Sequence, residues 1–217
     1  MFTTVLCDLD GTLVDSRQDI GAAFQQALRR LTVDVPCVAS IARHIGKPLE
    51  HMLQALGYTL SPEHLATFLS TYRHYYATQG LPHTRPFADV PPTLQALTAV
   101  ATCGVVTTKE QTQAEFVLQH LALTPFFQHI QGGRPGLRLK PAPDTVLAAL
   151  TALRCPPQQA LLVGDTAADI LAGKAAGVQT CAVTYGCGTL EELQQCEPEY
   201  VINTFGELRT LVAKRSK

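Results

Sequence analysis

Short apolar runs alternate with helical stretches along most of this 217-residue chain. The runs lie near positions 5–7, 103–106, 127–131, 160–163, 178–183 and 200–202. Each run has the length expected of a strand that is buried on both faces of a sheet. Because strands that alternate with helices form βαβ units, the pattern predicts an α/β fold with a doubly wound parallel sheet.

The segment that follows the first predicted strand has a different pattern, since only helical periodicity occurs in it. Two stretches repeat apolar residues at intervals of three and four: Ile20, Ala23, Phe24, Ala27, Leu28 and Leu31, and then Leu65, Phe68, Leu69, Tyr72 and Tyr76. The simplest architecture is therefore a core sheet interrupted by an inserted α-helical cap domain. We predict a core of residues 1–15 and 87–217, a cap of residues 16–86, and hinges near 14–17 and 81–89.

Three acidic residues lie at the ends of predicted strands. Asp8 and Asp10 follow the first apolar run, and Asp165 follows the run at 160–163. Open α/β sheets bind their ligands at this edge. Carboxylates gathered there repel one another, and a bound cation normally offsets that repulsion. Mg²⁺ is the expected ion, because it prefers a few carboxylates together with water and a phosphate.

The composition argues against several kinds of binding partner. Lys and Arg number 17 against 18 Asp and Glu, for a formal net charge of -1, so neither a nucleic-acid surface nor a polybasic membrane patch is indicated. The seven cysteines are scattered and never spaced as CxxC, which argues against a disulfide framework and a zinc site. Without a signal peptide or a stretch long enough to span a membrane, we expect a cytoplasmic monomer or homodimer.

The spacing of the first two acids suggests chemistry. Residues i and i+2 of an extended strand project to the same side, so Asp8 and Asp10 can reach one reacting centre, and Gly11 permits the tight turn that follows. One carboxylate could attack while the other transfers the proton. The competing interpretation is that Asp10 and Gly11 only form a turn.

Four motifs in order distinguish these interpretations. They are Asp8-Leu9-Asp10-Gly11-Thr12, Gly104-Val105-Val106-Thr107, the lysine of Lys140-Pro141-Ala142-Pro143-Asp144, and Gly164-Asp165-Thr166-Ala167-Ala168-Asp169. Any one of them is weak by itself. Together they resemble the motifs of the haloacid dehalogenase superfamily of phosphotransferases, and they extend over nearly the whole chain.

The resemblance implies roles for the acids. Asp8 would be the nucleophile that forms an aspartyl-phosphate, and Asp10 would protonate the leaving oxygen and then activate water. Asp8, Asp165 and the backbone carbonyl of Asp10 would hold Mg²⁺, while Lys140 would reduce the repulsion between nucleophile and phosphate. Asp169 lies one helical turn after Asp165 and would orient Lys140 or a metal-bound water without binding the metal itself.

The resemblance also implies substrate contacts. Thr107 would donate to a phosphate oxygen, with Thr108 beside it, although a threonine that ends a strand can equally be structural. Gly46 and Lys47 lie where related phosphatases have a cap loop that meets the leaving group. The alternative is that Gly46 ends one helix while Lys47 is solvated.

The chain departs from the patterns of several branches of the family, and these differences reduce the number of reactions to be expected. Asp10 is present, which argues against carbon–halogen hydrolysis, and the cap position where sugar phosphomutases usually have histidine is Ile20. Phosphoglycolate phosphatases often have an acid after the glycines of the third strand, where this chain has Arg134. We expect a Mg²⁺-dependent phosphatase of a small phosphorylated metabolite, phosphoglycolate being the leading substrate. The alternatives are a sugar phosphomutase, a pyrophosphatase or nucleotidase, and a non-catalytic phosphate-binding regulator.

Overall fold

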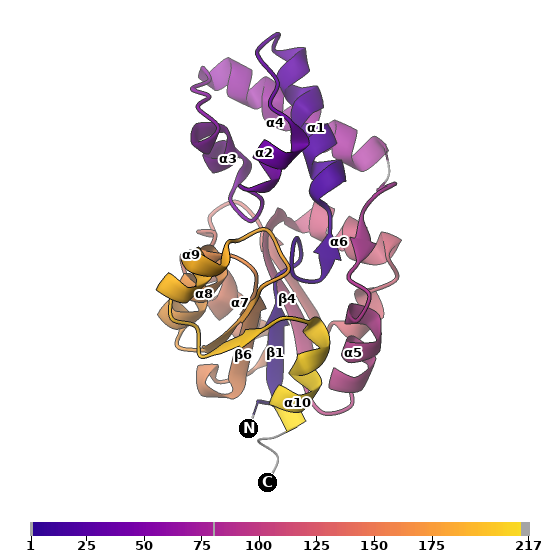
Figure 1. Cartoon of the computed structure of the whole chain (residues 1–217), viewed down its shortest axis with the longest axis vertical. Helices are drawn as coiled ribbons and strands as arrows, with labels where there is room; N and C mark the ends of the chain where they lie inside the picture. The colour runs from indigo at the N-terminus through magenta and orange to yellow at the C-terminus, as the bar shows by residue number, and fades with distance from the viewer. Residues whose placement is uncertain (1, 80, 214–217) are drawn as a thin grey trace.

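The computed structural model describes residues 2–79 and 81–213. A group of helices lies above the carboxyl end of an α/β core, as Figure 1 shows. The core contains one parallel sheet with the strand order β5-β4-β1-β6-β7-β8. Its strands are β1 (Thr4–Cys7), β4 (Thr102–Glu110), β5 (His129–Gly133), β6 (Ala160–Gly164), β7 (Gln179–Val183) and β8 (Tyr200–Ile202). The expected α/β class and doubly wound sheet are confirmed.

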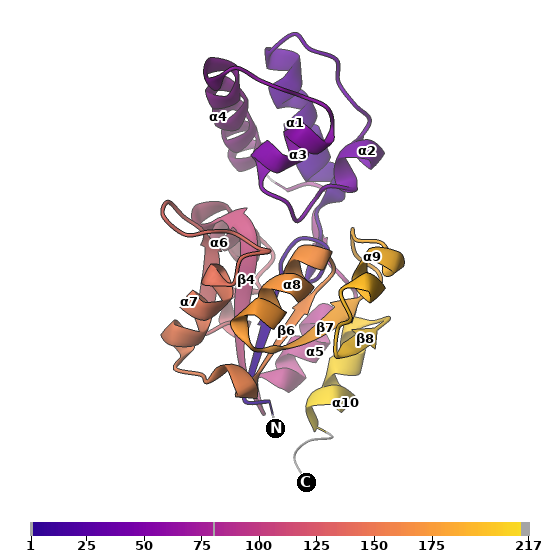
Figure 2. The same cartoon turned by 90° about the vertical axis from the view of Figure 1, so that its left-hand side faces the viewer.

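Helices cover both faces of this sheet, and the alternation of side chains along β1 explains how (Figure 2). Leu6 packs with α7 and α8 on one face, whereas Val5 and Cys7 belong to the cluster that includes α5, α6 and α10 on the other. The helices are α5 (Val90–Leu97), α6 (Gln111–His120), α7 (Asp144–Leu153), α8 (Ala167–Ala176), α9 (Leu190–Gln195) and α10 (Leu208–Ala213). Since both faces are covered, the strands are apolar without alternation.

The group of helices beyond the sheet packs through apolar side chains that are continuous with one of the two large clusters of the core. Its elements are α1 (Arg17–Arg30), α2 (Val38–Ala42), α3 (Leu49–Ala55) and α4 (Pro62–Thr78). Phe24 of α1 meets Phe68 of α4 edge to face, with ring centroids 4.8 Å apart, and Tyr72 and Tyr76 continue the aromatic row along α4. The apolar spacing that predicted helices in this segment therefore marks the buried faces of α1 and α4.

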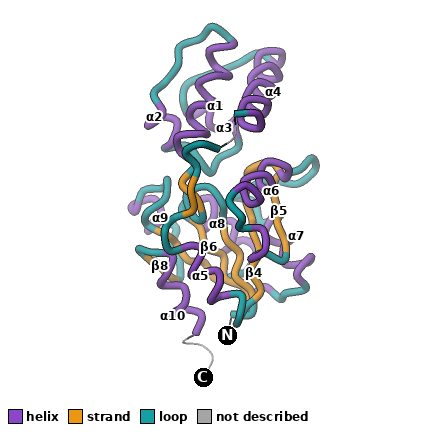
Figure 3. Tube along the Cα trace, turned by 90° about the vertical axis from the view of Figure 1, so that its right-hand side faces the viewer, coloured by secondary structure: helices purple, strands orange, loops and turns teal. Residues whose placement is uncertain are grey.

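The two chain crossings pair with each other, which the sequence did not predict. Strand β2 (Val14–Asp15) runs antiparallel to β3 (Arg85–Pro86), and Figure 3 shows this short ribbon between the helical group and the core. Because the ribbon begins and ends the insertion, it joins the helices α1 to α4 to the sheet at one place. The proposed domain limits, 1–15, 16–86 and 87–217, fall within or next to it, and the last four residues lie outside the described part of the chain.

Strand β4 is longer than its apolar run suggests, and strand β5 begins later than its run does. Strand β4 continues to Glu110 because its polar end still pairs with β5, where Glu110 is opposite Gly133. Strand β5 begins at His129, since residues 124–126 form a short 3₁₀ turn. No described helix is both long enough and apolar enough to cross a membrane.

Candidate active site

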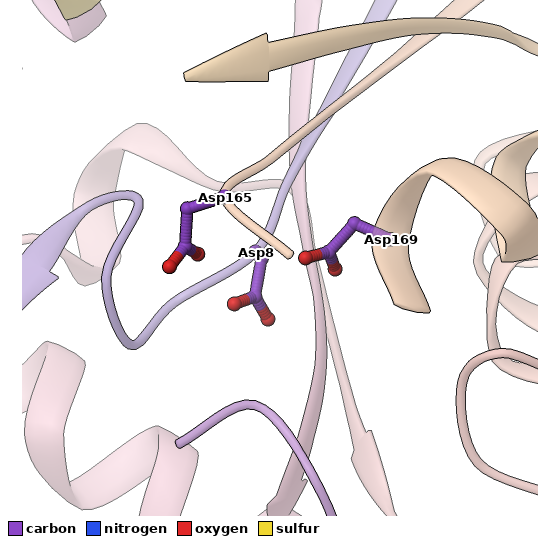
Figure 4. Close-up of side chains that lie close together, drawn as sticks. All are labelled: Asp8, Asp165 and Asp169. Carbon is purple, nitrogen blue, oxygen red and sulfur yellow. The ribbon is translucent and has the colours of Figure 1, made fainter. Parts of the chain in front are cut away.

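Three buried carboxylates meet at the carboxyl edge of the sheet. Asp8 directly follows β1 and Asp165 directly follows β6, which is the neighbour of β1, so the topology places the two acids side by side. Asp169 reaches the same point from the first turn of α8, as Figure 4 shows. Oxygens of the three carboxylates lie within 4.8 Å of one another. The structure thus brings together acids that are up to 161 positions apart in the chain.

Lys140 lies among these acids. Its Nζ donates to Asp8 Oδ1 at 2.7 Å, to Asp169 Oδ1 at 2.5 Å and to the backbone carbonyl of Val106 at 2.9 Å. The side chain is 2 % exposed, so all three hydrogens of the ammonium group have partners inside the protein. Asp169 is itself fixed, because its Oδ2 accepts from the amide and the hydroxyl of Thr166 at the start of α8. Asp169 is therefore a fixed acceptor for the ammonium group of Lys140.

The charges of this cluster are not balanced. Burial raises the pKa of Asp8 to about 7 even though Lys140 opposes the shift, and Asp169 adds to it. Burial, with Asp8 and Asp169 nearby, also raises the pKa of Asp165 well above its usual range. Burial lowers the pKa of Lys140 by itself, but Asp169 and Asp8 reverse that effect and the net pKa is raised. One ammonium group cannot balance three carboxylates when all of them are ionised, which is why the pKa values of Asp8 and Asp165 are raised in addition to the effect of burial.

The residues present fit a divalent cation. The cluster offers only carboxylate oxygens, which are hard ligands suited to Mg²⁺. None of the described residues donates to Asp8 Oδ2, so this oxygen is available to a ligand. Burial is the main cause of the raised pKa of Asp8 and Asp165, and a cation here would favour the ionised form of both carboxylates.

Asp165 is held by groups that the sequence did not single out. Its Oδ1 accepts from the hydroxyl of Thr12 at 2.8 Å, and its Oδ2 accepts from the amide of Cys187 at 2.7 Å. Gly11 has a φ of 93°, and a Cβ at this position would lie 2.1 Å from Asp165 Oδ2. Gly11 is therefore required for two reasons, its left-handed backbone and the close approach of Asp165.

Asp10 has different partners from Asp8. Its Oδ1 accepts from the hydroxyl of Ser16 at 2.6 Å, and its Oδ2 lies 3.0 Å from Lys109 Nζ. The Lys109 side chain is 5 % exposed and also contacts Tyr76 of α4, with Nζ 3.3 Å from the hydroxyl. Sequence reasoning missed Lys109, although a lysine two positions after Thr107 on an extended strand must project to the same side as that threonine.

The remaining candidates lie in β4 and in the loop before α3. Thr107 is buried and accepts from the amide of Lys109, which leaves its own hydroxyl hydrogen available to a ligand. Thr108 donates to the backbone carbonyl of Gly46 at 2.9 Å and so joins β4 to the loop before α3. Lys47 follows in the same loop, where its Nζ lies 3.5 Å from His44 Nδ1.

A cavity of about 430 Å³ separates the loop before α3 from the core. Asp10, Thr108 and Lys109 line it from the core, and Gly46 and Lys47 line it from the helical group. Asp8, which is 2 % exposed, does not line this cavity. The structure thus places three of the four candidate substrate contacts, Thr108, Gly46 and Lys47, on the walls of one space that Asp10 also lines, whereas Thr107 does not line it.

Several known proteins are similar to this chain in sequence and in fold. A phosphoglycolate phosphatase of Aquifex aeolicus is 33% identical over 183 residues, which is 84% of each chain. A pyrophosphatase of Anoxybacillus flavithermus is 28% identical over 215 residues, 99% of this chain and 98% of its own. The solved structure of a haloacid dehalogenase-like hydrolase from Streptococcus pneumoniae has a TM-score of 0.87 and 30% identity, covering 99% of both chains. Residues 5–183 match the haloacid dehalogenase-like hydrolase family, and the chain belongs to that family.

Proposed function

We propose that this protein is a Mg²⁺-dependent phosphatase that hydrolyses a small phosphomonoester through an aspartyl-phosphate on Asp8. The observation that carries the proposal is the Asp8 carboxylate itself. One of its oxygens is held by Lys140, and the other accepts no hydrogen bond from the described residues. A buried carboxylate with one fixed and one available oxygen is oriented for attack on phosphorus.

The reaction is a double displacement. In the first step an oxygen of Asp8 forms a bond to phosphorus, the bond from phosphorus to the leaving oxygen breaks, and Asp10 gives that oxygen a proton. In the second step Asp10 takes a proton from water, the water oxygen attacks phosphorus, and the bond to Asp8 breaks to release inorganic phosphate. The contacts of Asp10 with Ser16 and Lys109 hold its carboxylate in place for both proton transfers.

Phosphoryl transfer also requires that the negative charge of the transferring phosphoryl group be neutralised. Lys140 provides one positive charge beside Asp8, and the hydroxyl of Thr107 provides a hydrogen-bond donor from within the second half of β4. Asp8 and Asp165, together with the backbone carbonyl of Asp10, would hold Mg²⁺, which neutralises the transferring phosphoryl group when bound.

Phosphoglycolate is the leading substrate and inorganic pyrophosphate the second candidate, because relatives of this chain carry both activities in their names. We expect measurable phosphate release from a panel of phosphate esters with Mg²⁺, and a loss of that release when the metal is chelated. Released phosphate and isomerised product are measured in parallel. Isomer formation would identify a phosphomutase instead, and tight binding without release of phosphate would identify a non-catalytic phosphate-binding regulator.

Metal binding also has a consequence for stability. In the absence of divalent cations the raised pKa of Asp8 keeps a proton on it in the folded protein up to about pH 7, whereas the unfolded chain releases that proton near the ordinary pKa of 3.8. The folded state therefore binds more protons between these values, and the free energy of unfolding should fall as the pH rises from about 4 to about 7. Added Mg²⁺ should reverse that loss, because it binds the ionised carboxylates.

Thermal unfolding measured at several pH values, with and without Mg²⁺, checks this expectation. In Asp165→Asn the rise in Tm on adding Mg²⁺ should largely disappear, since a neutral amide replaces one of the proposed ligands. In Glu191→Asn, an exposed acid at the start of α9, the rise should be the same as in the wild type. A Tm that does not respond to Mg²⁺ at any pH would contradict the proposed metal site.

A further inference from the structure

The cavity between the loop before α3 and the core contains four basic residues, and they differ in their partners. Lys109 pairs with Asp10, and Arg73 pairs with Glu110 at 2.7 Å. Arg134 also lines the cavity, but no carboxylate among the described residues lies within ion-pair distance of it. Among the described residues, the polar contact of the Lys47 ammonium group on the opposite wall is with a histidine ring, that of His44. The cavity therefore offers positive charge that the described residues do not neutralise.

Arg134 is held in place by a buried amide. One end of the guanidinium group, Nη2, donates to Gln131 Oε1 at 2.9 Å. Gln131 is 1 % exposed, and its own Nε2 donates to the backbone carbonyl of Gly132 at 2.8 Å, which fixes the direction of the amide. A guanidinium group has five hydrogens in a rigid plane, so this single bond orients Arg134 and leaves the other donors for a ligand.

Two glycines bring this arginine close to the second motif. A Cβ on Gly132 would lie 2.5 Å from Gln111 Cα, and a Cβ on Gly133 would lie 3.1 Å from the carbonyl oxygen of Thr108. The end of β5 therefore packs backbone to backbone against the end of β4, where Thr108 and Lys109 line the cavity. The Gly-Gly-Arg sequence places a positive charge on the core wall beside the residues proposed to meet the substrate.

The cavity is also larger and more apolar than a phosphate group requires. Its volume of about 430 Å³ is within the range of pockets that hold whole organic ligands. Apolar side chains occupy both walls: Ile45, Leu49 and Met52 from the helical group, and Leu137 and Leu139 from the core. The space accommodates a leaving group with a carbon skeleton. The lining acid Glu50, which has no ion pair with another described residue, lies on the wall opposite Arg134.

We propose that Arg134 determines substrate specificity by binding an anionic group on the leaving-group side of the substrate, so that the preferred substrates are phosphate esters of organic acids or of other phosphates. This inference rests on the proposed phosphatase function and names the chemical class of its substrate. A carboxylate and a second phosphate share the required chemistry, because both accept two parallel hydrogen bonds from a guanidinium group.

Three esters with the same three-carbon chain test the proposal. They are 3-hydroxypropyl phosphate, whose leaving group is neutral, 3-phosphooxypropanoate, which ends in a carboxylate, and propane-1,3-diyl bisphosphate, which ends in a second phosphate. In the wild type we expect kcat/KM to be at least about tenfold higher for an anionic ester than for the neutral one. The two anionic esters distinguish carboxylate from phosphate recognition.

The matched variants are Arg134→Gln and Arg138→Gln. Arg138 lies in the same loop, pairs with Asp144 and has a side chain that is 76% exposed, but it does not line the cavity. Arg134→Gln should remove most of the preference for anionic esters through an increase in KM, and Arg134→Lys should restore part of it. Arg138→Gln, which removes the same charge from the same loop, should leave the preference unchanged.

Two results would overturn this proposal without affecting the phosphatase function. One is a wild type that hydrolyses all three esters equally well, and the other is a preference that Arg134→Gln leaves intact. If the wild type releases no phosphate from any ester, the proposed function fails. Calorimetric binding of the same esters to Asp8→Asn, with and without Arg134→Gln, then decides the question, and equal affinities would refute the role of Arg134.

Discussion

Replacing Asp8 by Asn is expected to abolish phosphate release, with a fall in kcat of about 10⁴-fold or more. The amide oxygen of Asn is neutral and forms no acyl-phosphate bond, so the covalent route is closed while the shape of the side chain is preserved. Steady-state release of phosphate measures the loss. Acid-quenched protein from a reaction with labelled substrate measures the aspartyl-phosphate, which should be present in the wild type and missing from the variant.

The fold should survive this substitution. Asp8 is one of three buried carboxylates that face one ammonium group, and its raised pKa means that its charge destabilises the folded state at neutral pH when no cation is bound. The variant should therefore unfold at the same temperature as the metal-free wild type or at a higher one. Asp34→Asn, an exposed acid in the segment between α1 and α2, is the control that should retain full activity. Substantial turnover by Asp8→Asn would exclude the covalent mechanism.

Local patterns in the sequence predicted the parts of the structure that depend on local causes. Apolar runs without alternation mark strands covered on both faces, and β1 and β6 are such strands. An acid directly after a strand must lie at the edge of the sheet, which is why Asp8 and Asp165 could be assigned to one site from their positions alone. The helical spacing in α1 and α4 was predictable for the same reason, since the buried face of each helix faces the other.

Contacts between distant segments could not be predicted in this way. The pairing of Lys109 with Tyr76 depends on how the end of α4 packs against the end of β4, and no pattern within either segment reports that packing. The hydrogen bonds that Asp165 accepts from Thr12 and from the amide of Cys187 also join separate loops. The site acids could thus be found in the sequence, whereas most of the groups that hold them in place could not.

Lys140 holds the carboxylates of Asp8 and Asp169 together. Its replacement should therefore have a large effect on both stability and turnover. In Lys140→Met the carboxylates of Asp8 and Asp169 keep their buried positions but lose the only ammonium group that the described residues place between them. Removal of one partner from a buried ion pair costs about 3–5 kcal/mol. We expect a decrease of that size in the free energy of unfolding, measured by urea denaturation, and a fall in kcat of about 10³-fold, because the positive charge beside the attacking carboxylate is gone.

A double-mutant cycle separates the stability effect from the catalytic one. Asp169→Asn removes the charge of the second carboxylate that Lys140 Nζ contacts. Lys140→Met should therefore cost less stability in the Asp169→Asn background than in the wild type. Activity should not recover in the double variant, since the positive charge beside Asp8 is still missing. Lys174→Met, an exposed lysine in the last turn of α8, should change neither quantity. Equal stability losses in both backgrounds would mean that Lys140 and Asp169 are not coupled, and near-normal turnover by Lys140→Met would remove the lysine from the proposed mechanism.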